Sequence, residues 1–248
     1  MQDHGKLVIS LQESLQSKAL QKTKVWWESY MKGVIPFRGV GIPEIRTLVS
    51  LWIDEHGIKD FSQEDQLELA LTLFREPIAE DKLAGILYLQ YYLYDQMNWE
   101  DLLKKYETLY LDNLIFDWNT CDWFCVRVLS PTIAKHGADC AQSISLWRTS
   151  GNLWQARSSV VAFIKVASNR GYYPYIQESC HVLIERQERF AKTSVGWILR
   201  DISKHDEEFV KSFVEQHLKS FSIESLRNAL KYIDQREREK YVKMLKTA

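Results

Sequence analysis

Glycine and proline are scarce in this sequence, which contains 10 Gly and 5 Pro among 248 residues. Average proteins contain about 12% of these two residues together, which is well above the share found here. Tight turns are therefore few, which argues against β-sandwiches, barrels and repeated βαβ units. Hydrophobic residues make up 46% of the chain, which is enough for a folded core and excludes extensive disorder.

Long apolar runs and paired cysteines are also absent. No run reaches the roughly 18 residues of a membrane-spanning helix, and the opening MQDHGKLVIS lacks the pattern of a signal peptide. The four cysteines, at 121, 125, 140 and 180, form no C-x-x-C pair and no disulfide-type spacing. We therefore expect free thiols in a cytoplasmic protein with no membrane association.

The net charge of −1 hides an uneven distribution of charge. Residues 51–100 contain 3 basic and 11 acidic residues, whereas residues 151–200 contain 7 basic and 3 acidic residues. A basic region can bind phosphate locally, because surface charges more than about 10 Å apart are largely screened. Solvated helix faces produce similar splits, so the pattern alone assigns no partner.

Apolar residues recur with helical spacing along nearly the whole chain. Leu7, Leu11 and Leu15 predict an N-terminal helix, VIPFRGVGIP predicts a structured loop, and Pro43 suits the first turn of a helix ending near Glu55. A helix through LELALTLF follows the predicted cap Ser62. The other predicted helices cover about 22–32, 78–95, 98–110, 118–136, 139–149, 152–168, 173–187, 189–204, 206–220 and 222–246.

Local signals refine these limits. Asn98, Asn152 and Ser222 are predicted caps, because their side chains accept hydrogen bonds from the free N–H groups of a first turn. Pro131 falls inside 118–136 and is expected to kink or split that helix.

The predicted helices form pairs. The inner helices begin near Asp81, Asp122, Trp154 and Phe190, with spacings of 41, 32 and 36 residues. These values lie in or just below the range of HEAT-type two-helix repeats. Periodicity alone leaves two architectures open, an α-solenoid and an irregular helical bundle.

Common nucleotide and hydrolase motifs are missing, and metal ligands are poorly supported. There is no G-x-x-x-x-G-K-[ST], G-x-G-x-x-G or G-x-S-x-G motif, and no two of the six histidines are spaced i, i+4. Cys121 and Cys125 lie one turn apart, but two thiols do not make a zinc site. We therefore expect no metal and no organic cofactor.

Tryptophans and charged residues on the inner helices are more informative. Trp118 and Asp122 lie at i and i+4 in FDWNTCDWF, which places an indole and a carboxylate one turn apart on one helix face. Arg157 lies in NLWQARSS, and Trp197 and Arg200 lie at i and i+3 in SVGWILRD. If inner helices stack side by side, these groups converge on the concave face of a solenoid.

These motifs resemble the AlkD-type DNA alkylation repair glycosylases, which are built from HEAT-like repeats. The likeness covers nearly the whole chain, through ESYMKGVIPFRGVGIPEIRTL, DWNTCD, IAKHG, GNLWQARSS and AKTSVGWILRD. By resemblance, Trp118 and Asp122 match the family's Trp–Asp pair, Arg157 its W-x-x-R arginine, and Trp197 its second functional Trp. Tyr30 matches the N-terminal tyrosine that lines the family's site.

A second register, anchored on Trp123, would pair this indole with Arg127 and leave the motif without an acid. Anchoring on Asp122 brings IAKHG and NLWQAR into line without gaps, so we adopt that register. The other register would describe a DNA-binding protein without chemistry.

The resemblance implies an all-α fold, a curved α-solenoid of HEAT-like two-helix repeats, as a single domain over residues 1–248. It implies a monomeric, monofunctional glycosylase that excises cationic N3- and N7-alkylated purines from double-stranded DNA, cytoplasmic and nucleoid-associated when bound. The implied catalytic residues are Asp122, Trp118 and Trp197, and the implied DNA-binding residues are Arg157, Arg200 and Tyr30.

The chemistry fits these residue types. An alkylated purine is already cationic and leaves readily, so the enzyme has only to stabilise positive charge on the sugar and supply water. A carboxylate can do both, indole faces attract cations by roughly 0.5–2 kcal/mol, and arginines hold phosphates.

Structural roles also fit each of these residues: core positions for the aromatic side chains, a surface or helix-capping position for Asp122, and ion pairs between repeats for the arginines. Two rival functions remain open, a non-catalytic binder of damaged or branched DNA and a protein-interaction scaffold.

Overall fold

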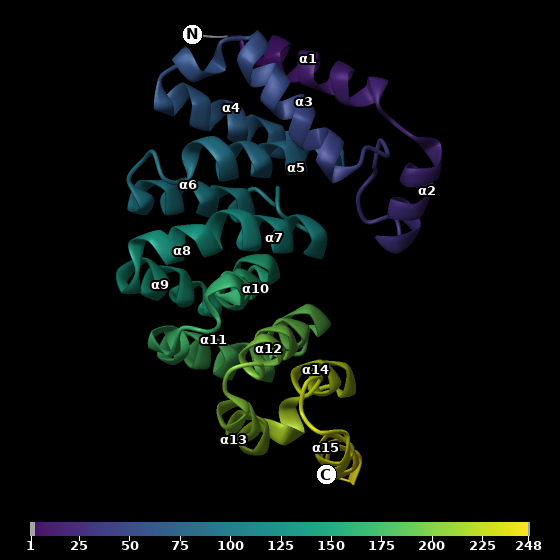
Figure 1. The fold of residues 1–248 in the computed structure, drawn as a ribbon, viewed down its shortest axis with the longest axis vertical. Helices are drawn as coiled ribbons and strands as arrows, with labels where there is room; N and C mark the ends of the chain where they lie inside the picture. Colours follow the sequence, from purple (N-terminus) through teal and green to yellow (C-terminus); the bar gives the residue numbers. More distant parts are fainter. Residues whose placement is uncertain (1–2, 248) are drawn as a thin grey trace. The chain divides into compact units, whose positions relative to one another are not determined.

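The computed structural model describes residues 3–247, and every regular element in that range is helical. The chain divides into two compact units, residues 1–128 and 129–248, and in each unit successive helices are paired and stacked (Figure 1). The prediction of an all-α solenoid of two-helix repeats is therefore confirmed. None of the described helices is long and apolar enough to cross a membrane.

The first unit is built around one fully buried helix. Its helices are α1 (His4–Ser17), α2 (Gln21–Tyr30), α3 (Ile42–Glu55), α4 (Gln63–Arg75), α5 (Ala79–Tyr88), α6 (Trp99–Leu111) and α7 (Trp118–Phe124). Every residue of α5 is buried, and α5 contacts α3, α4 and α7. A π-helical turn, Leu89–Leu93, extends it. The charged residues at the start of α5 therefore lie inside the protein.

The second unit centres on α12. Its helices are α8 (Ser130–His136), α9 (Ala138–Ser145), α10 (Leu153–Val161), α11 (Tyr173–Glu185), α12 (Arg189–Ile202), α13 (Glu207–His217), α14 (Ile223–Ala229) and α15 (Gln235–Thr247). α12 contacts α10, α11, α13 and α14. Its apolar side fills the interior of the unit, as its buried residues Ala191, Val195, Ile198, Leu199 and Ile202 show.

The predicted caps are confirmed. The side chains of Ser62, Asn98 and Asn152 each accept a backbone hydrogen bond from the first turn of the helix that follows. Ser222 and Ser225 form a reciprocal capping box at the start of α14. The four capping side chains, of Ser62, Asn98, Asn152 and Ser222, fix where their helices begin, because they satisfy the free N–H groups of the first turn.

Pro131 splits the 118–136 segment, as expected. α7 ends at Phe124, the residues Cys125–Leu129 form a π-helical turn, and Pro131 occupies the first turn of α8. A proline is tolerated there because the N–H groups of a first turn have no partner inside the helix.

The prediction of one helix over 222–246 is wrong. α14 ends at Ala229, and α15 begins only at Gln235. The Asp234 carboxylate accepts hydrogen bonds from the N–H groups of Arg236, at 2.9 Å, and Glu237, at 3.4 Å, so it starts a new helix. The apolar spacing ran across this break and concealed it. The predicted 152–168 helix is also too long, because α10 ends at Val161 and a 3₁₀ turn, Ile164–Val166, follows.

All four cysteines are free and buried, as the sequence predicts. Burial raises the pKa of the Cys140 thiol to about 12 and also raises the pKa of Cys180. Since the thiolate is the reactive form, these two side chains act as small apolar core residues.

Gly196 allows α12 and α14 to approach closely. A Cβ atom at this position would lie 2.5 Å from the carbonyl oxygen of Ser225, which belongs to the backbone of α14. No side chain rotation can relieve such a contact, so the glycine sets the distance between the two helices.

We expect Gly196→Ala to lower the free energy of unfolding by about 1–3 kcal/mol, the usual cost of overpacking. The matched control is Gly151→Ala, because a Cβ at Gly151 meets nothing within 4 Å. Denaturant unfolding of both variants measures the difference, and equal midpoints would contradict the close approach.

Candidate active site

A buried carboxylate anchors the loop between α2 and α3. Glu80, at the start of α5, accepts hydrogen bonds from the backbone N–H groups of Arg38 (2.9 Å), Gly39 (2.7 Å) and Val40 (3.0 Å). All four residues are buried. Charge-assisted hydrogen bonds of this kind are stronger than neutral ones, so the loop that carries α2 is fixed to the core of the first unit.

A buried ion pair supports the same loop. The guanidinium of Arg38 donates to Asp81 at 2.8 Å. Burial raises the pKa of Asp81 to about 6, although Arg38 opposes the shift. Gly39 has φ of +98°, and a Cβ there would lie 2.3 Å from the carbonyl oxygen of Leu20. Only glycine lets this loop pass the start of α2.

An aromatic cluster joins α2 to the start of α7. The Tyr30 ring packs edge-on against Trp118, with centroids 5.3 Å apart, and stacks on Trp26 at 5.2 Å. Behind them Trp27 stacks on Phe37 at 5.4 Å. Tyr30 and Trp26 are 53% and 56% exposed. The structure thus brings two predicted site residues, Tyr30 and Trp118, into contact and leaves aromatic surface open to a ligand.

Asp122 lies one turn after Trp118 on α7. Both side chains are half-buried, and their i, i+4 spacing on a helix puts them on the same face. The cap of α7 is Asp117, whose carboxylate accepts from the N–H and the hydroxyl of Thr120 at 2.9 and 2.7 Å. Asp122 is therefore not the helix cap.

In the second register of the motif, which is anchored on Trp123, the two paired residues Trp123 and Arg127 are in contact. The guanidinium of Arg127 lies 4.8 Å from the ring centre of Trp123. This cation–π contact gives both side chains a structural role.

Lys82 is a charged residue near this cluster that the sequence analysis missed. It is 2% exposed, its Nζ donates to the carbonyl of Phe74, and it lies 5.4 Å from the centre of the Phe116 ring. Burial lowers its pKa, while Asp117 and other carboxylates nearby oppose the shift. The feature of the sequence that could have identified Lys82 is the charged run Glu80-Asp81-Lys82, which stands at the start of an otherwise apolar helix.

In the second unit, Arg157 on α10 fastens the start of α12. Its side chain is buried, at 4% exposure, and its Nη1 donates to the carbonyl of Phe190 at 2.6 Å and lies 3.3 Å from the hydroxyl of Thr193. A contact between Arg157 and phosphate stays a prediction, because the contacts seen within this unit are structural.

Trp197 and Arg200 lie together on α12, as their spacing predicts. The guanidinium carbon of Arg200 is 5.8 Å from the Trp197 ring centre, and its Nη2 is 3.1 Å from the carboxylate of Asp201. Both side chains remain half-buried, so each keeps some surface for a ligand.

The predicted site residues are divided between the two units, with Tyr30, Trp118 and Asp122 in the first and Arg157, Trp197 and Arg200 in the second. Their convergence on one cleft stays a prediction. Within residues 3–247 no group of three or more His, Cys, Asp and Glu side chains is arranged to hold a metal ion.

We expect Glu80→Ala to release the loop over 38–40, because three buried N–H groups lose their acceptor at about 1–3 kcal/mol for each group left unpaired. Hydrogen exchange of these amides should become faster and the melting temperature should fall. Glu13→Ala, on an exposed face of α1, is the control. Unchanged exchange in Glu80→Ala would show that the carboxylate does not hold the loop.

Comparisons with known proteins place the chain in a family. A family model described as DNA alkylation repair enzyme matches residues 11–233. Among solved structures, the "Predicted DNA alkylation repair enzyme from Enterococcus faecalis" aligns with a TM-score of 0.74 and 17% identity, over 88% of this chain and 98% of that chain. That likeness concerns the fold. No curated protein matches the sequence. On the strength of the family match over most of its length, the chain belongs to the DNA alkylation repair enzyme family.

Proposed function

We propose that the protein is a DNA glycosylase that excises cationic N3- and N7-alkylated purines from double-stranded DNA. The family supports a role in alkylation repair. The observation that carries the proposal is the face of α7, where the Asp122 carboxylate lies one turn from Trp118 and the Tyr30 ring packs on that indole. A carboxylate beside open aromatic faces is suited to a cationic base and a cationic sugar.

In the proposed reaction the bond between C1′ and the base nitrogen breaks. Its electron pair goes to the base and neutralises the positive charge. Positive charge develops on the sugar, where the Asp122 carboxylate stabilises it by electrostatics. Water adds its oxygen to C1′, and its proton passes to the carboxylate and then to solvent. The products are the free alkylated base and an abasic site.

A monofunctional reaction fits the state of Lys82, which lies beside Phe116. Lys82 is buried and its Nζ is bound to a backbone carbonyl, so it has no access to C1′ and we assign it no nucleophilic role. In the second unit we propose that Trp197 contributes a further indole to catalysis and that Arg200 and Arg157 contact phosphates. Arg200 is the better supported of the two, because its side chain is 25% exposed.

The sharpest test is Asp122→Asn, which keeps the size of the side chain and removes its negative charge. Base release should fall by about 10²–10³, the usual effect of losing one well-placed electrostatic group. DNA binding should persist, because a negative charge that faces a polyanion has been removed. The measurement is single-turnover release of 7-methylguanine from methylated duplex DNA, identified by its mass. Asp112→Asn, at the exposed end of α6, is the control.

Equal release by Asp122→Asn and the wild type would refute this mechanism while leaving the family membership intact. If the wild type binds duplex DNA but releases no base, the chain is a non-catalytic binder. If it binds no DNA, it is a scaffold.

Arg200→Gln tests the phosphate contact. Affinity for duplex DNA should fall. The slope of the logarithm of the binding constant against the logarithm of the salt concentration should become shallower by about 0.9 for each phosphate contact removed. The cost to folding should be small, because Asp201 keeps a second cationic partner in Lys204. Lys104→Gln, an exposed residue on α6 paired with Asp101, removes the same charge elsewhere. An unchanged salt slope in Arg200→Gln would exclude the contact.

A further inference from the structure

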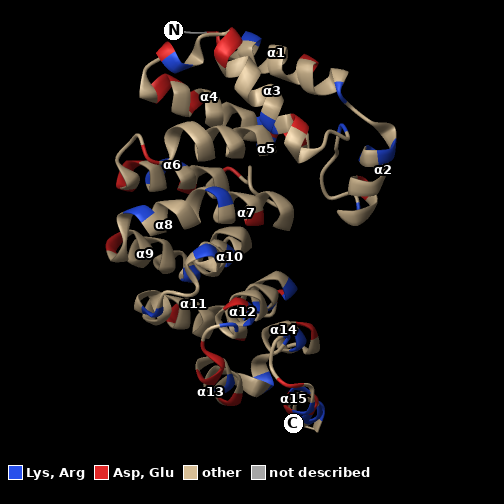
Figure 2. Cartoon of the chain, in the orientation of Figure 1, with Lys and Arg blue, Asp and Glu red and all other residues tan. Residues whose placement is uncertain are grey.

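The last helix lies outside the part of the chain that matches the family. The match ends at residue 233, and α15 spans Gln235–Thr247. The helix is rich in basic residues, which recur along its ribbon in Figure 2. They are Arg236, Arg238, Lys240, Lys243 and Lys246, against the acidic residues Glu237 and Glu239.

α15 is docked by its apolar and acidic side chains. Tyr241 is buried, and its hydroxyl donates to Glu215 on α13 at 2.6 Å. Glu237 pairs at 2.8 Å with Lys211, which also pairs with Glu207 at 2.6 Å. The acid of α15 that faces α13 is thus already neutralised.

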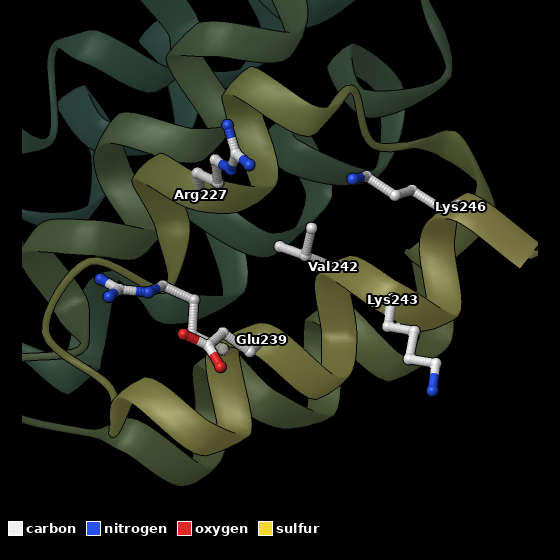
Figure 3. Close-up of a pocket in the computed structure, with 6 residues that line it drawn as sticks. Arg227, Glu239, Val242, Lys243 and Lys246 are labelled. Atoms are coloured by element: carbon white, nitrogen blue, oxygen red, sulfur yellow. The ribbon is translucent and has the colours of Figure 1, made fainter.

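α15 and α14 also border a basic groove. The groove has a volume of about 490 Å³ and is lined by Arg227, Arg238, Glu239, Val242, Lys243 and Lys246. Figure 3 shows Arg227 of α14 and Lys246 of α15 extending on the same side of Val242. Four cationic groups and one carboxylate line this space, so it favours an anion over an apolar ligand.

The cations of this groove are not neutralised by the protein. Within residues 3–247, Arg227, Lys243 and Lys246 form no ion pair. The acid on α14, Glu224, is held by Arg189 through two hydrogen bonds of 2.6 and 2.8 Å. Glu239 accepts from the side-chain amide of Gln235 at 2.8 Å. Glu224 is therefore neutralised by Arg189, and the single charge of Glu239 is left facing four basic side chains in the groove, which keeps a net positive charge for an external anion.

We propose that the groove between α14 and α15 binds the phosphate backbone of duplex DNA, as an anchor separate from the residues that act on the base. The proposal rests on the proposed function, since a repair enzyme meets repeated phosphates along its substrate. Such a row of phosphates matches basic residues on successive turns of one helix. An anionic membrane is the weaker candidate, because an interfacial helix needs a free apolar face, whereas Tyr241 is buried against α13.

The test is the triple variant Arg227→Gln, Lys243→Gln, Lys246→Gln, with a short undamaged duplex as the probe. Affinity at low salt should fall roughly tenfold or more, and the log–log salt slope should lose up to about 2–3. Release of 7-methylguanine at saturating DNA should be unchanged. The charge-matched control is Lys6→Gln, Lys104→Gln, Lys105→Gln, three exposed residues paired with nearby acids. This control variant should keep the DNA affinity and the salt slope of the wild type.

Several outcomes would overturn the anchor. These are unchanged binding by the triple variant, an equal loss in the control, and binding to anionic vesicles but not to duplex DNA. If the triple variant has a lower melting temperature, the double variant Lys243→Gln, Lys246→Gln decides, since both side chains are exposed.

The two proposals fail separately. A wild type that releases no base but loses DNA affinity in the triple variant refutes the glycosylase and keeps the anchor. If the wild type releases base and the triple variant binds DNA normally, the glycosylase proposal is kept and the anchor is refuted.

Discussion

The candidate site depends on one buried carboxylate that binds backbone. Glu80 accepts three consecutive N–H groups of the loop, and next to it Asp81 holds the guanidinium of Arg38. A buried carboxylate without such partners would cost several kcal/mol, so the helix start and the loop require each other. The loop in turn carries α2, which puts the Tyr30 ring against Trp118. The aromatic surface on which the proposed chemistry relies is therefore supported by electrostatics in the core.

Local features were predictable because their causes are local. A polar cap or a proline acts within one turn, so the limits of most helices and the split at Pro131 could be predicted from neighbouring residues. The shared face of Trp118 and Asp122 follows from helical periodicity alone. The break before α15 had a local signal too, in Asp234, but the apolar spacing on both sides kept the same period and outweighed it. Periodicity reports which face is apolar, and it does not report whether the chain turns between two helices.

Burial of charged side chains could not be predicted, because it depends on contacts far apart in the sequence. Glu80 and Lys82 have the residue types of a solvated face, yet both lie in the core because α3, α4 and α7 surround α5. The arginines differ in their partners for the same reason. Arg157 is bound to a backbone carbonyl, Arg200 shares Asp201 with a lysine, and Arg227 has no acidic partner in the described chain. Only the environment determines which of them can offer charge to a ligand.

A net charge of −1 poses a problem for a protein that acts on a polyanion through a carboxylate. In the proposed mechanism Asp122 must stay ionised beside the substrate, and it repels the same phosphates that bring the base into the site. Attraction must then come from cations that the protein's own acids do not screen. Acids such as Glu224 and Glu237 are paired with basic residues of neighbouring helices. Within residues 3–247, Lys243 and Lys246 have no such acidic partner. In the proposed function, segregation of charge rather than its sum lets a nearly neutral chain bind DNA, and α15, with five basic residues against two acidic ones, is one place where charge is segregated.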